Sequence, residues 1–346
     1  MNRPLEGAGG GPPASVIAGI GAYVPPNPVT NHDLSLRLDT SDEWIRSRTG
    51  ISSRHMVLPG QATSDLAVEA GRRALESAGP EHAEGVDAVV LATTTPDRAC
   101  PATAPEVAWR LGLGTVAAFD VSAVCSGFLY GLATATGLIT AGTADRVLLI
   151  AADAFTTLVD PRDRSTAVIF ADGAGAVVLR AGRPDEPGAV GPVVLGSDGS
   201  LAGLLEVPGG GSRQRASGEP ARPGDEFLRM AGRDTYRHAV ERMADASRRA
   251  VKAAGCGLAD IDRLAAHQAN ARILTTVAEH LGIPEDRRLS NIDRNGNTVA
   301  ASIPLLLADS ATDGSLTAGH RVLLTAFGAG LAWGAATVQW PDVKPG

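Results

Sequence analysis

Short apolar runs alternate with helix-like segments along most of this sequence. The apolar runs cover residues 86–92, 116–124, 147–152, 261–267 and 322–326. Such uninterrupted runs are typical of strands in a sheet that helices cover on both faces. The pattern therefore predicts an α/β fold.

The sequence also repeats itself at a nearly constant offset. Three segments recur 175 or 176 positions later, namely 72–79 as 248–255, 86–92 as 261–267, and 145–151 as 320–326. Three matches in the same order favour an internal duplication over a chance likeness of one segment. Each half is predicted to contain a helix, a strand, a loop, a second helix, a second strand and a glycine-rich hairpin.

Length and turn signals suggest how the chain is divided. At 346 residues it exceeds the roughly 250–300 residues at which one hydrophobic core stops growing. The polar, turn-rich stretch 181–188 predicts a boundary between halves at 15–182 and 188–346. We expect a disordered N-terminal tail over residues 1–14, and a mobile surface loop or lid over the Gly-, Pro- and Arg-rich segment 208–225.

Composition narrows the class of protein. With 44% hydrophobic and 20% charged residues the chain resembles an ordinary globular protein. Its net charge of −7 argues against general binding to nucleic acid or to an anionic membrane surface, and no apolar run approaches the ~20 residues of a membrane span. The three cysteines form no CxxC pair, which favours neither a disulfide framework nor a zinc site, and a reducing cytoplasm is expected.

Cys125 marks the most informative position in the sequence. The strand-like run 116–124 ends at this residue, and a helix-like run begins at Gly127. Unpaired N–H groups and the positive end of a helix dipole meet at such a junction and favour the nucleophilic thiolate. The alternative is a buried cysteine that packs as a small hydrophobe.

Three further polar or glycine-rich features follow predicted strands or precede predicted helices. His267 ends an apolar run, and taken alone it would be a structural histidine. Asn297, in the sequence Asn-Gly-Asn-Thr, would by itself be a turn or N-cap residue. The segment 327–334 is either a tight hairpin or a loop whose main-chain N–H groups bind an oxyanion.

Six segments in order carry a resemblance to a known family. They are SDEWIRSRTGI at 41–51, the Cys125 segment, DRST at 163 with FADGAGA at 170, HQAN at 267, GNT at 296 and FGAG at 327. From about Val16 to Trp340 the chain resembles β-ketoacyl-acyl carrier protein synthase III, within the thiolase-fold condensing enzymes. The resemblance implies a thiolase fold, in which duplicated halves form a five-layered α-β-α-β-α core, and a homodimer.

The resemblance also implies a two-step reaction. Cys125 would attack an acyl-CoA thioester, with the main-chain N–H groups of Cys125 and Ala329 as the oxyanion hole. His267 and Asn297 would then donate hydrogen bonds to the thioester oxygen of malonyl-acyl carrier protein as it loses CO2. Elongating synthases of the superfamily carry a second histidine and thiolases a second cysteine, so Asn297 indicates the CoA-primed type. No metal and no cofactor besides the CoA thioester substrate is implied.

The remaining expectations concern binding. By resemblance, the CoA-binding residues are Trp44, Arg48, Arg164 and Asn270, and the acyl-pocket residues are Phe170 and Cys100. The alternatives are an amphipathic helix residue for the tryptophan and solvated charges for the arginines. Cys100 stands where the family commonly has a phenylalanine that limits the partner subunit's pocket, which predicts branched or longer primers than acetyl.

Docking of the acyl carrier protein is expected to involve Arg237 and Arg272. On the helix after His267, however, positions that are basic in the family read Glu279 and His280. This departure indicates either docking with fewer charges or a specialised carrier protein, so that a pathway-specific role in polyketide priming is open beside fatty acid synthesis.

Two other functions remain open from the residues. The first is a non-condensing acyltransferase of the same fold, which would move the acyl group from Cys125 to a carrier thiol or a small-molecule hydroxyl. The second is a non-catalytic partner or scaffold. Release of CO2 separates condensation from acyl transfer, and acylation of Cys125 excludes the scaffold.

Overall fold

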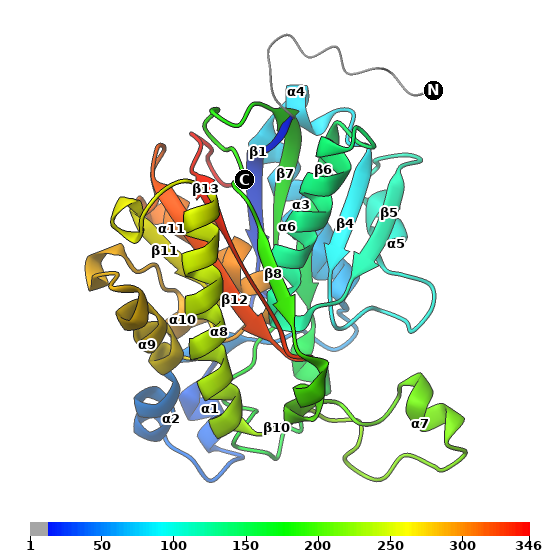
Figure 1. The fold of residues 1–346 in the computed structure, drawn as a ribbon. Coiled ribbons are helices and arrows are strands. Elements are labelled where there is room, and N and C mark those ends of the chain that lie inside the picture. Colours follow the sequence, from blue (N-terminus) through cyan, green and yellow to red (C-terminus); the bar gives the residue numbers. More distant parts are fainter. Residues whose placement is uncertain (1–12) are drawn as a thin grey trace.

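A computed structural model describes residues 13–346 of the protein (Figure 1). The tail expected over residues 1–14 lies outside the described residues except for its last two, and Ala14 already begins strand β1. Two large sheets form the framework. The first has the strand order β1-β7-β6-β4-β5 and the second the order β11-β12-β13-β8.

The strands of both sheets have between four and ten residues, and all except β5 and β8 are mostly buried. The first sheet consists of β1 (Ala14–Tyr23), β4 (Ala88–Ala92), β5 (Ala117–Val121), β6 (Arg146–Asp153) and β7 (Gly173–Gly182). The second consists of β8 (Val194–Ser197), β11 (Arg263–Ala266), β12 (Arg321–Gly328) and β13 (Ala332–Gln339). Strand β4 runs parallel to β5 and β6, and β11 runs parallel to β12, while the other pairs are antiparallel.

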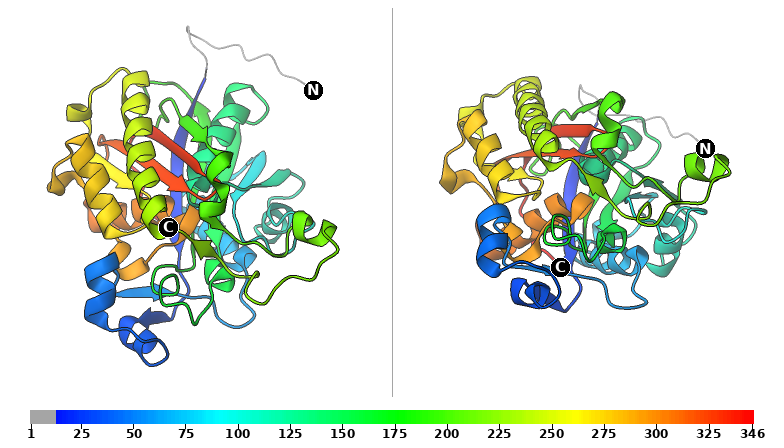
Figure 2. Two further views of the ribbon diagram at one scale, coloured as in Figure 1. Left: turned by 60° about the horizontal axis from the view of Figure 1, so that its bottom comes forward. Right: turned by 90° about the horizontal axis from the view of Figure 1, so that it is seen from below.

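Helices cover the sheets on the outside and separate them on the inside (Figure 2). The outer helices are α3 (Thr63–Ala78) and α5 (Ala104–Arg110) on the first sheet, and α8 (Gly232–Ala253) and α9 (Ala271–Leu281) on the second. The inner pair is α6 (Gly127–Thr140) and α11 (Ser302–Asp313). The predicted thiolase fold with five α-β-α-β-α layers is thereby confirmed.

The predicted duplication appears in the element boundaries. Strand β11, helix α11 and strand β12 begin 175 positions after β4, α6 and β6. The strand expected over 116–124 is shorter, because it ends at Val121 and the chain then turns into the 3-10 helix η1 (Val124–Ser126). The turn at Val124 has a φ of 45°, which lies outside the β region.

Smaller elements surround this core. They are β2 (Pro28–Thr30), α1 (Asn31–Ser35), α2 (Asp42–Thr49), β3 (Ser53–His55), α4 (Pro80–Ala83), β9 (Leu205–Glu206), α7 (Ser212–Ala216), β10 (Arg229–Met230) and α10 (Ile292–Asn295). The segment 208–225, predicted as a surface loop or lid, contains α7, is mostly exposed and projects from the body (Figure 1). Within residues 13–346, no helix is both long and apolar enough to cross a membrane.

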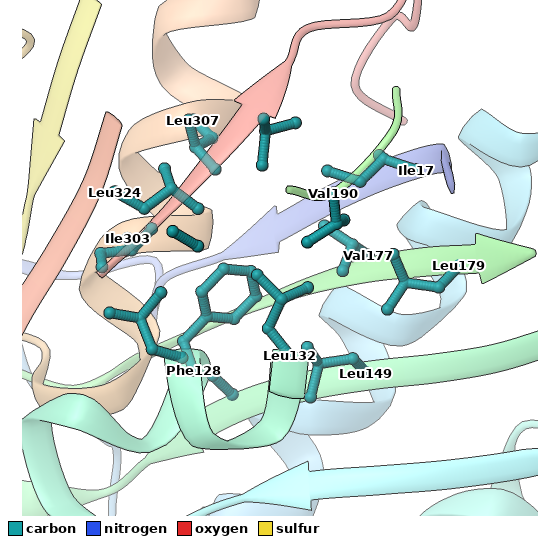
Figure 3. Packing of buried hydrophobic residues seen from close by; sticks show 14 of the residues in the cluster. Ile17, Phe128, Leu132, Leu149, Val177, Leu179, Val190, Ile303, Leu307 and Leu324 are labelled. Atoms are coloured by element: carbon teal, nitrogen blue, oxygen red, sulfur yellow. The ribbon is translucent and has the colours of Figure 1, made fainter. Parts of the chain in front are cut away.

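The inner layer contains the main hydrophobic core (Figure 3). Phe128 and Leu132 on α6 pack with Ile303 and Leu307 on α11, and Leu324 of β12 joins them from the second sheet. All five side chains are buried. Packing of α6 between the sheets therefore fixes the helix that follows Cys125.

The core position of α6 leads to a stability prediction. Leu132→Ala should lower the free energy of unfolding by about 2–5 kcal/mol, because it removes buried methyl groups and leaves a cavity. The same change at Leu36, which is 74% exposed, should have an effect within about 0.5 kcal/mol. Urea denaturation of the two variants compares them, and equal losses would contradict the buried position of α6.

Candidate active site

Cys125 lies in a tight turn between β5 and α6. The turn begins at Val124, a β-branched residue whose φ of 45° is unfavourable and must be held by its surroundings. The same strain recurs 175 positions later at Val299, with a φ of 54° at the start of the 3-10 helix η6 (Val299–Ala301). Both copies of the strand-to-helix connection therefore enter their inner helix through the same strained turn.

The starts of the two inner helices face each other. Gly127 opens α6, and a Cβ atom built on it would lie 3.0 Å from the Cβ of Ala300 in η6. Only glycine permits this close approach without displacing the neighbour. The positive ends of the dipoles of α6 and α11 therefore converge at the centre of the molecule.

The end of β12 closes this centre from the second sheet. A Cβ on Gly328 would lie 2.8 Å from the main-chain nitrogen of Cys125 and 3.2 Å from its Cβ. Among the turn and loop hydrogen bonds of residues 13–346, no main-chain carbonyl accepts from the N–H of Cys125 or of Ala329. Two open main-chain donors beside a sulfur suit a developing oxyanion.

His267 is held by main-chain and side-chain contacts at the end of β11. Its main-chain N–H donates to Thr325 over 2.8 Å, and its Nδ1 lies 2.6 Å from the Ser302 hydroxyl. That hydroxyl accepts from the N–H of Gln268 over 3.2 Å, so its own proton is available to Nδ1. This arrangement favours the tautomer of His267 that carries its proton on Nε2.

The other ring nitrogen of His267 is ready for a ligand. Nε2 is buried and has no hydrogen-bond partner among the described residues. Burial lowers the pKa of His267 to about 3, so the ring is neutral at physiological pH. A neutral N–H donor at this place suits an oxygen that gains negative charge.

Asn297 presents an amide donor near the same centre. Its Oδ1 accepts from the N–H of Val299 over 3.0 Å, which directs the Nδ2 group away from that contact. Its main chain is fixed against the first half, donating to Ile169 over 3.0 Å and accepting from Ala171 over 2.9 Å. The side chain is buried, and strand-like pairing with Phe170 holds it in place.

The environment of the sulfur works against the thiolate expected from the helix terminus alone. Burial raises the pKa of Cys125, the charge of Asp153 raises it further, and the N–H of Cys125 itself lowers it. Cys125 is 7% exposed. In this closed state the sulfur therefore rests as the thiol, and its proton leaves during attack.

A cavity of 970 Å³ opens beside Ala123, Val124 and Ala329. Its apolar wall includes Phe155, and the predicted pocket residue Phe170 lies behind that ring, with centroids 4.8 Å apart. Further apolar lining residues include Leu158, Leu205, Val207, Leu228 and Leu331. Such a chamber next to Cys125 can hold an acyl chain.

Cys100 does not line this cavity in its own chain. It is exposed, whereas its neighbour Ala99 belongs to the lining. The loop that carries Cys100 is thus at the rim of the cavity, and contact with a partner subunit's pocket stays a prediction.

Trp44 lies between two arginines on the surface. The guanidinium carbon of Arg48 is 4.7 Å from the centre of a Trp44 ring, and that of Arg164 is 5.1 Å away. Arg164 also donates to the carbonyl of Asp39 over 2.7 Å. An adenine stacked on Trp44 would have to move one arginine off the ring, and cation–π contact would then pass to the adenine.

The other predicted binding residues make structural contacts in this state. The Asn270 side chain caps α9 by accepting from the N–H of Arg272 over 2.9 Å, and it donates to the carbonyl of Arg48 over 3.1 Å. Arg272 donates to the carbonyl of Ser47 over 2.9 Å, so both residues tie α9 to the end of α2. Arg237 is exposed and lies 3.6 Å from Asp234.

Several residues of this centre were not singled out in the sequence. They are Val124, Asp153, Gly328, Val299 and Ser302. The offset of 175 pairs Val124 with Val299 and Asp153 with Gly328. The difference between aspartate and glycine at the second pair of positions could have drawn attention to Asp153 and Gly328 in the sequence. Ser302 gave no signal, because its contact with His267 joins residues 35 positions apart.

Fold and centre together define a class of enzyme: a thiolase-fold acyltransferase. Comparison with known proteins agrees. Models of 3-oxoacyl-[acyl-carrier-protein] synthase III match residues 119–199, and models of its C-terminal part match residues 251–340.

Full-length relatives extend the match. β-Ketoacyl-[acyl-carrier-protein] synthase III 3 of Streptomyces coelicolor is 55% identical over 332 residues, covering 96% of this chain and 99% of the relative. The crystal structure of 3-oxoacyl-(acyl carrier protein) synthase III from Pseudomonas aeruginosa PAO1 is 47% identical with a TM-score of 0.89, covering 96% and 100% of the chains. The priming β-ketosynthase from the R1128 polyketide biosynthetic pathway is 34% identical with a TM-score of 0.87, covering 97% and 99%. This chain belongs to the β-ketoacyl-acyl carrier protein synthase III family.

The close approach of Gly328 to Cys125 gives a prediction. Gly328→Ala should slow acylation of Cys125 by about 10²–10³-fold, because the new methyl group would press on the main-chain N–H that is expected to stabilise the oxyanion. Gly137→Ala on α6, the helix that follows Cys125, has open space around its Cβ and should leave the rate unchanged. Stopped-flow measurement of CoA release compares the two, and an unimpaired Gly328→Ala enzyme would remove Cys125 N–H from the oxyanion hole.

Proposed function

We propose that this protein condenses an acyl-CoA primer with malonyl-acyl carrier protein through an acyl-Cys125 intermediate. The products are 3-oxoacyl-acyl carrier protein, CO2 and CoA, and the reaction would start fatty acid or polyketide synthesis. The observation that carries the proposal is the buried, neutral and unpartnered Nε2–H of His267. Simple acyl transfer to a thiol has no use for such a donor, whereas decarboxylation to an enolate needs one.

In the first step the Cys125 sulfur forms a bond to the acyl carbon and the bond from that carbon to the CoA sulfur breaks. The thiol proton of Cys125 ends on the CoA thiol, so protons balance. The tetrahedral oxyanion is stabilised by the open N–H groups of Cys125 and Ala329. The acyl chain occupies the cavity lined by Phe155.

In the second step malonyl-acyl carrier protein loses CO2, and the electron pair of the broken C–C bond enters the thioester as an enolate. Nε2–H of His267 and the amide of Asn297 donate hydrogen bonds to the enolate oxygen. The enolate carbon then attacks the acyl carbon on Cys125, and the sulfur leaves as the thiolate, which takes up a proton. Neutral donors suit this step, because a buried cation would have to be desolvated beforehand.

The alternative function is acyl transfer without condensation, to a carrier thiol or a small-molecule hydroxyl. The two functions share the first step and differ in the release of CO2. The retained His267 and Asn297 favour condensation.

The partners proposed are acyl-CoA, malonyl-acyl carrier protein and a second copy of this chain. Strand β5 is the edge of the first sheet, and Trp109 on the adjoining α5 is 76% exposed. An unpaired edge next to an exposed tryptophan favours a subunit interface there. Arg237 and Arg272 are proposed to meet the acidic carrier protein, and the reaction is expected in the cytoplasm without a metal or cofactor.

Intact-protein mass spectrometry tests the function. After incubation with a panel of acyl-CoAs, the wild type should gain the acyl mass, and Cys125→Ala should not. Addition of malonyl-acyl carrier protein should discharge the adduct with release of CO2 and formation of a 3-oxoacyl product. His267→Ala and Asn297→Ala should keep the adduct and lose about 10²–10³-fold in CO2 release, as expected for removed oxyanion donors.

Two outcomes of that experiment would change the assignment. An adduct that moves to another acceptor without CO2 would make this protein an acyltransferase. Absence of any adduct at Cys125 would make it a non-catalytic member of the family.

Primer size gives a separate prediction. If Cys100 leaves room in the partner subunit's pocket, the wild type should load branched or longer acyl-CoAs at least as well as acetyl-CoA. Cys100→Phe should slow loading of the long primers and spare acetyl-CoA, because an aromatic ring would fill the space. The ratio of loading rates measures this, and Cys256→Phe, at a cysteine outside the cavity lining, serves as a control. A wild type that loads only acetyl-CoA would refute the enlarged pocket.

A further inference from the structure

Asp153 is a buried acidic residue whose hydrogen-bond partners within residues 13–346 are all uncharged. It ends β6, and its Oδ1 accepts from the N–H of Thr94 over 2.7 Å and from the hydroxyls of Thr95 and Thr93 over 3.1 and 3.3 Å. Its Oδ2 accepts from the N–H of Ala300 over 3.2 Å. The side chain therefore joins a loop of the first half to the start of α11 in the second half.

The duplication explains this placement. Ala300 is the counterpart of Cys125, and Gly328 is the counterpart of Asp153, each 175 positions away. The last residue of β12 is Gly328, which leaves the N–H of Cys125 open to a substrate oxyanion. The last residue of β6 is Asp153, whose side chain occupies the N–H of Ala300.

The contacts of Asp153 reach both walls of the centre. Thr94 and Thr95 line the cavity beside Cys125. Ala300 lies between Asn297 and Ser302, the residue that orients His267. A shift at Ala300 would therefore move both proposed enolate donors relative to the sulfur.

We propose that Asp153 is a positioning residue of the condensation step, and that its carboxylate fills the duplicated copy of the oxyanion hole to hold the enolate donors against Cys125. The proposal rests on the proposed function, which it deepens. The carboxylate would then have two effects. It would hold η6 in place against the first half, and its negative charge would raise the pKa of the nearby Cys125 thiol.

The second effect distinguishes this role from a purely structural one. Burial raises the pKa of Asp153 to about 7, while hydrogen bonds from Thr94 and Ala300 lower it. Above that pH the ionised carboxylate opposes formation of the Cys125 thiolate, and His267 is neutral and adds no charge. Asp172, another buried carboxyl group, does not contribute to the shift in the pKa of Cys125.

Asp172 supplies a matched control. It is also buried, burial also raises its pKa, and it accepts from the N–H groups of Val57 and Thr156, each over 2.7 Å. Asp172→Asn thus disturbs a comparable buried network. Asp153→Asn in addition removes the charge near Cys125 and places an amide N–H opposite the N–H of Ala300.

The first experiment measures alkylation of Cys125 by iodoacetamide between pH 7 and 9.5. The readout is the mass of the proteolytic peptide that contains Cys125, because the exposed Cys100 also reacts. A nearby carboxylate shifts a pKa by about one unit or more, so Asp153→Asn should raise the alkylation rate roughly tenfold at a given pH above 7. Asp172→Asn should follow the wild type. Superposed profiles of Asp153→Asn and wild type would overturn the proposal.

The second experiment separates the half-reactions. Asp153→Asn should load acyl-CoA at the wild-type rate or faster, yet release CO2 from malonyl-acyl carrier protein about a hundredfold more slowly, as expected for misplaced donors. Equal losses in both half-reactions would indicate a structural role and overturn the proposal. If Asp153→Asn does not fold, Asp153→Ser, which is also neutral and can still accept from Thr94, should show the same two effects.

These readouts fail separately from the proposed function. Alkylation of Cys125 needs no substrate, so its pH profile reports on Asp153 even if the protein does not condense. Wild-type loading without CO2 release would refute condensation, whereas unchanged alkylation in Asp153→Asn would refute the role of Asp153 alone.

Discussion

Two helices begin head to head at the centre of this protein, and their unpaired N–H groups must be satisfied. Gly127 of α6 meets Ala300 before α11 at a distance that only the absence of a side chain allows. Each helix start favours an anion by about 0.3–2 kcal/mol. At Ala300 the side chain of Asp153 accepts from the N–H, whereas the N–H of Cys125 donates to no main-chain carbonyl among the described residues. We propose that the substrate oxyanion binds at Cys125, so that the difference between Asp153 and Gly328 would give the duplicated scaffold a single active site.

Burial of the polar groups is the second constraint on the site. Burial keeps His267 neutral and raises the pKa of Cys125, so the resting centre contains few full charges. The unpartnered Nε2 of His267 costs the free protein about 1–3 kcal/mol, the usual cost of a buried donor without an acceptor. In the proposed condensation an enolate oxygen would remove that cost, which would make the interaction stronger in the reacting state than in the free enzyme.

The sequence predicted most of the scaffold because its signals are local. Apolar runs gave β4, β6, β11 and β12 within a few residues, and the offset of 175 predicted the duplicated halves. The end of β5 was misplaced, because the strained φ of Val124 is imposed by tertiary packing and not by the preference of valine. Cys125, His267 and Asn297 were identified from motifs of the family, whereas Asp153 and Ser302 act through contacts between residues 147 and 35 positions apart. Such contacts leave no pattern in a local window.

A crystal structure of the acyl-enzyme tests the central claim most directly. We expect the acyl carbonyl oxygen on Cys125 to lie about 3 Å from the main-chain nitrogens of both Cys125 and Ala329. We also expect the carboxylate of Asp153 to keep its hydrogen bond from the N–H of Ala300. A carbonyl oxygen that accepts from another donor, or an Asp153 side chain that no longer contacts Ala300, would contradict the proposal that one helix start binds the substrate and the other binds Asp153.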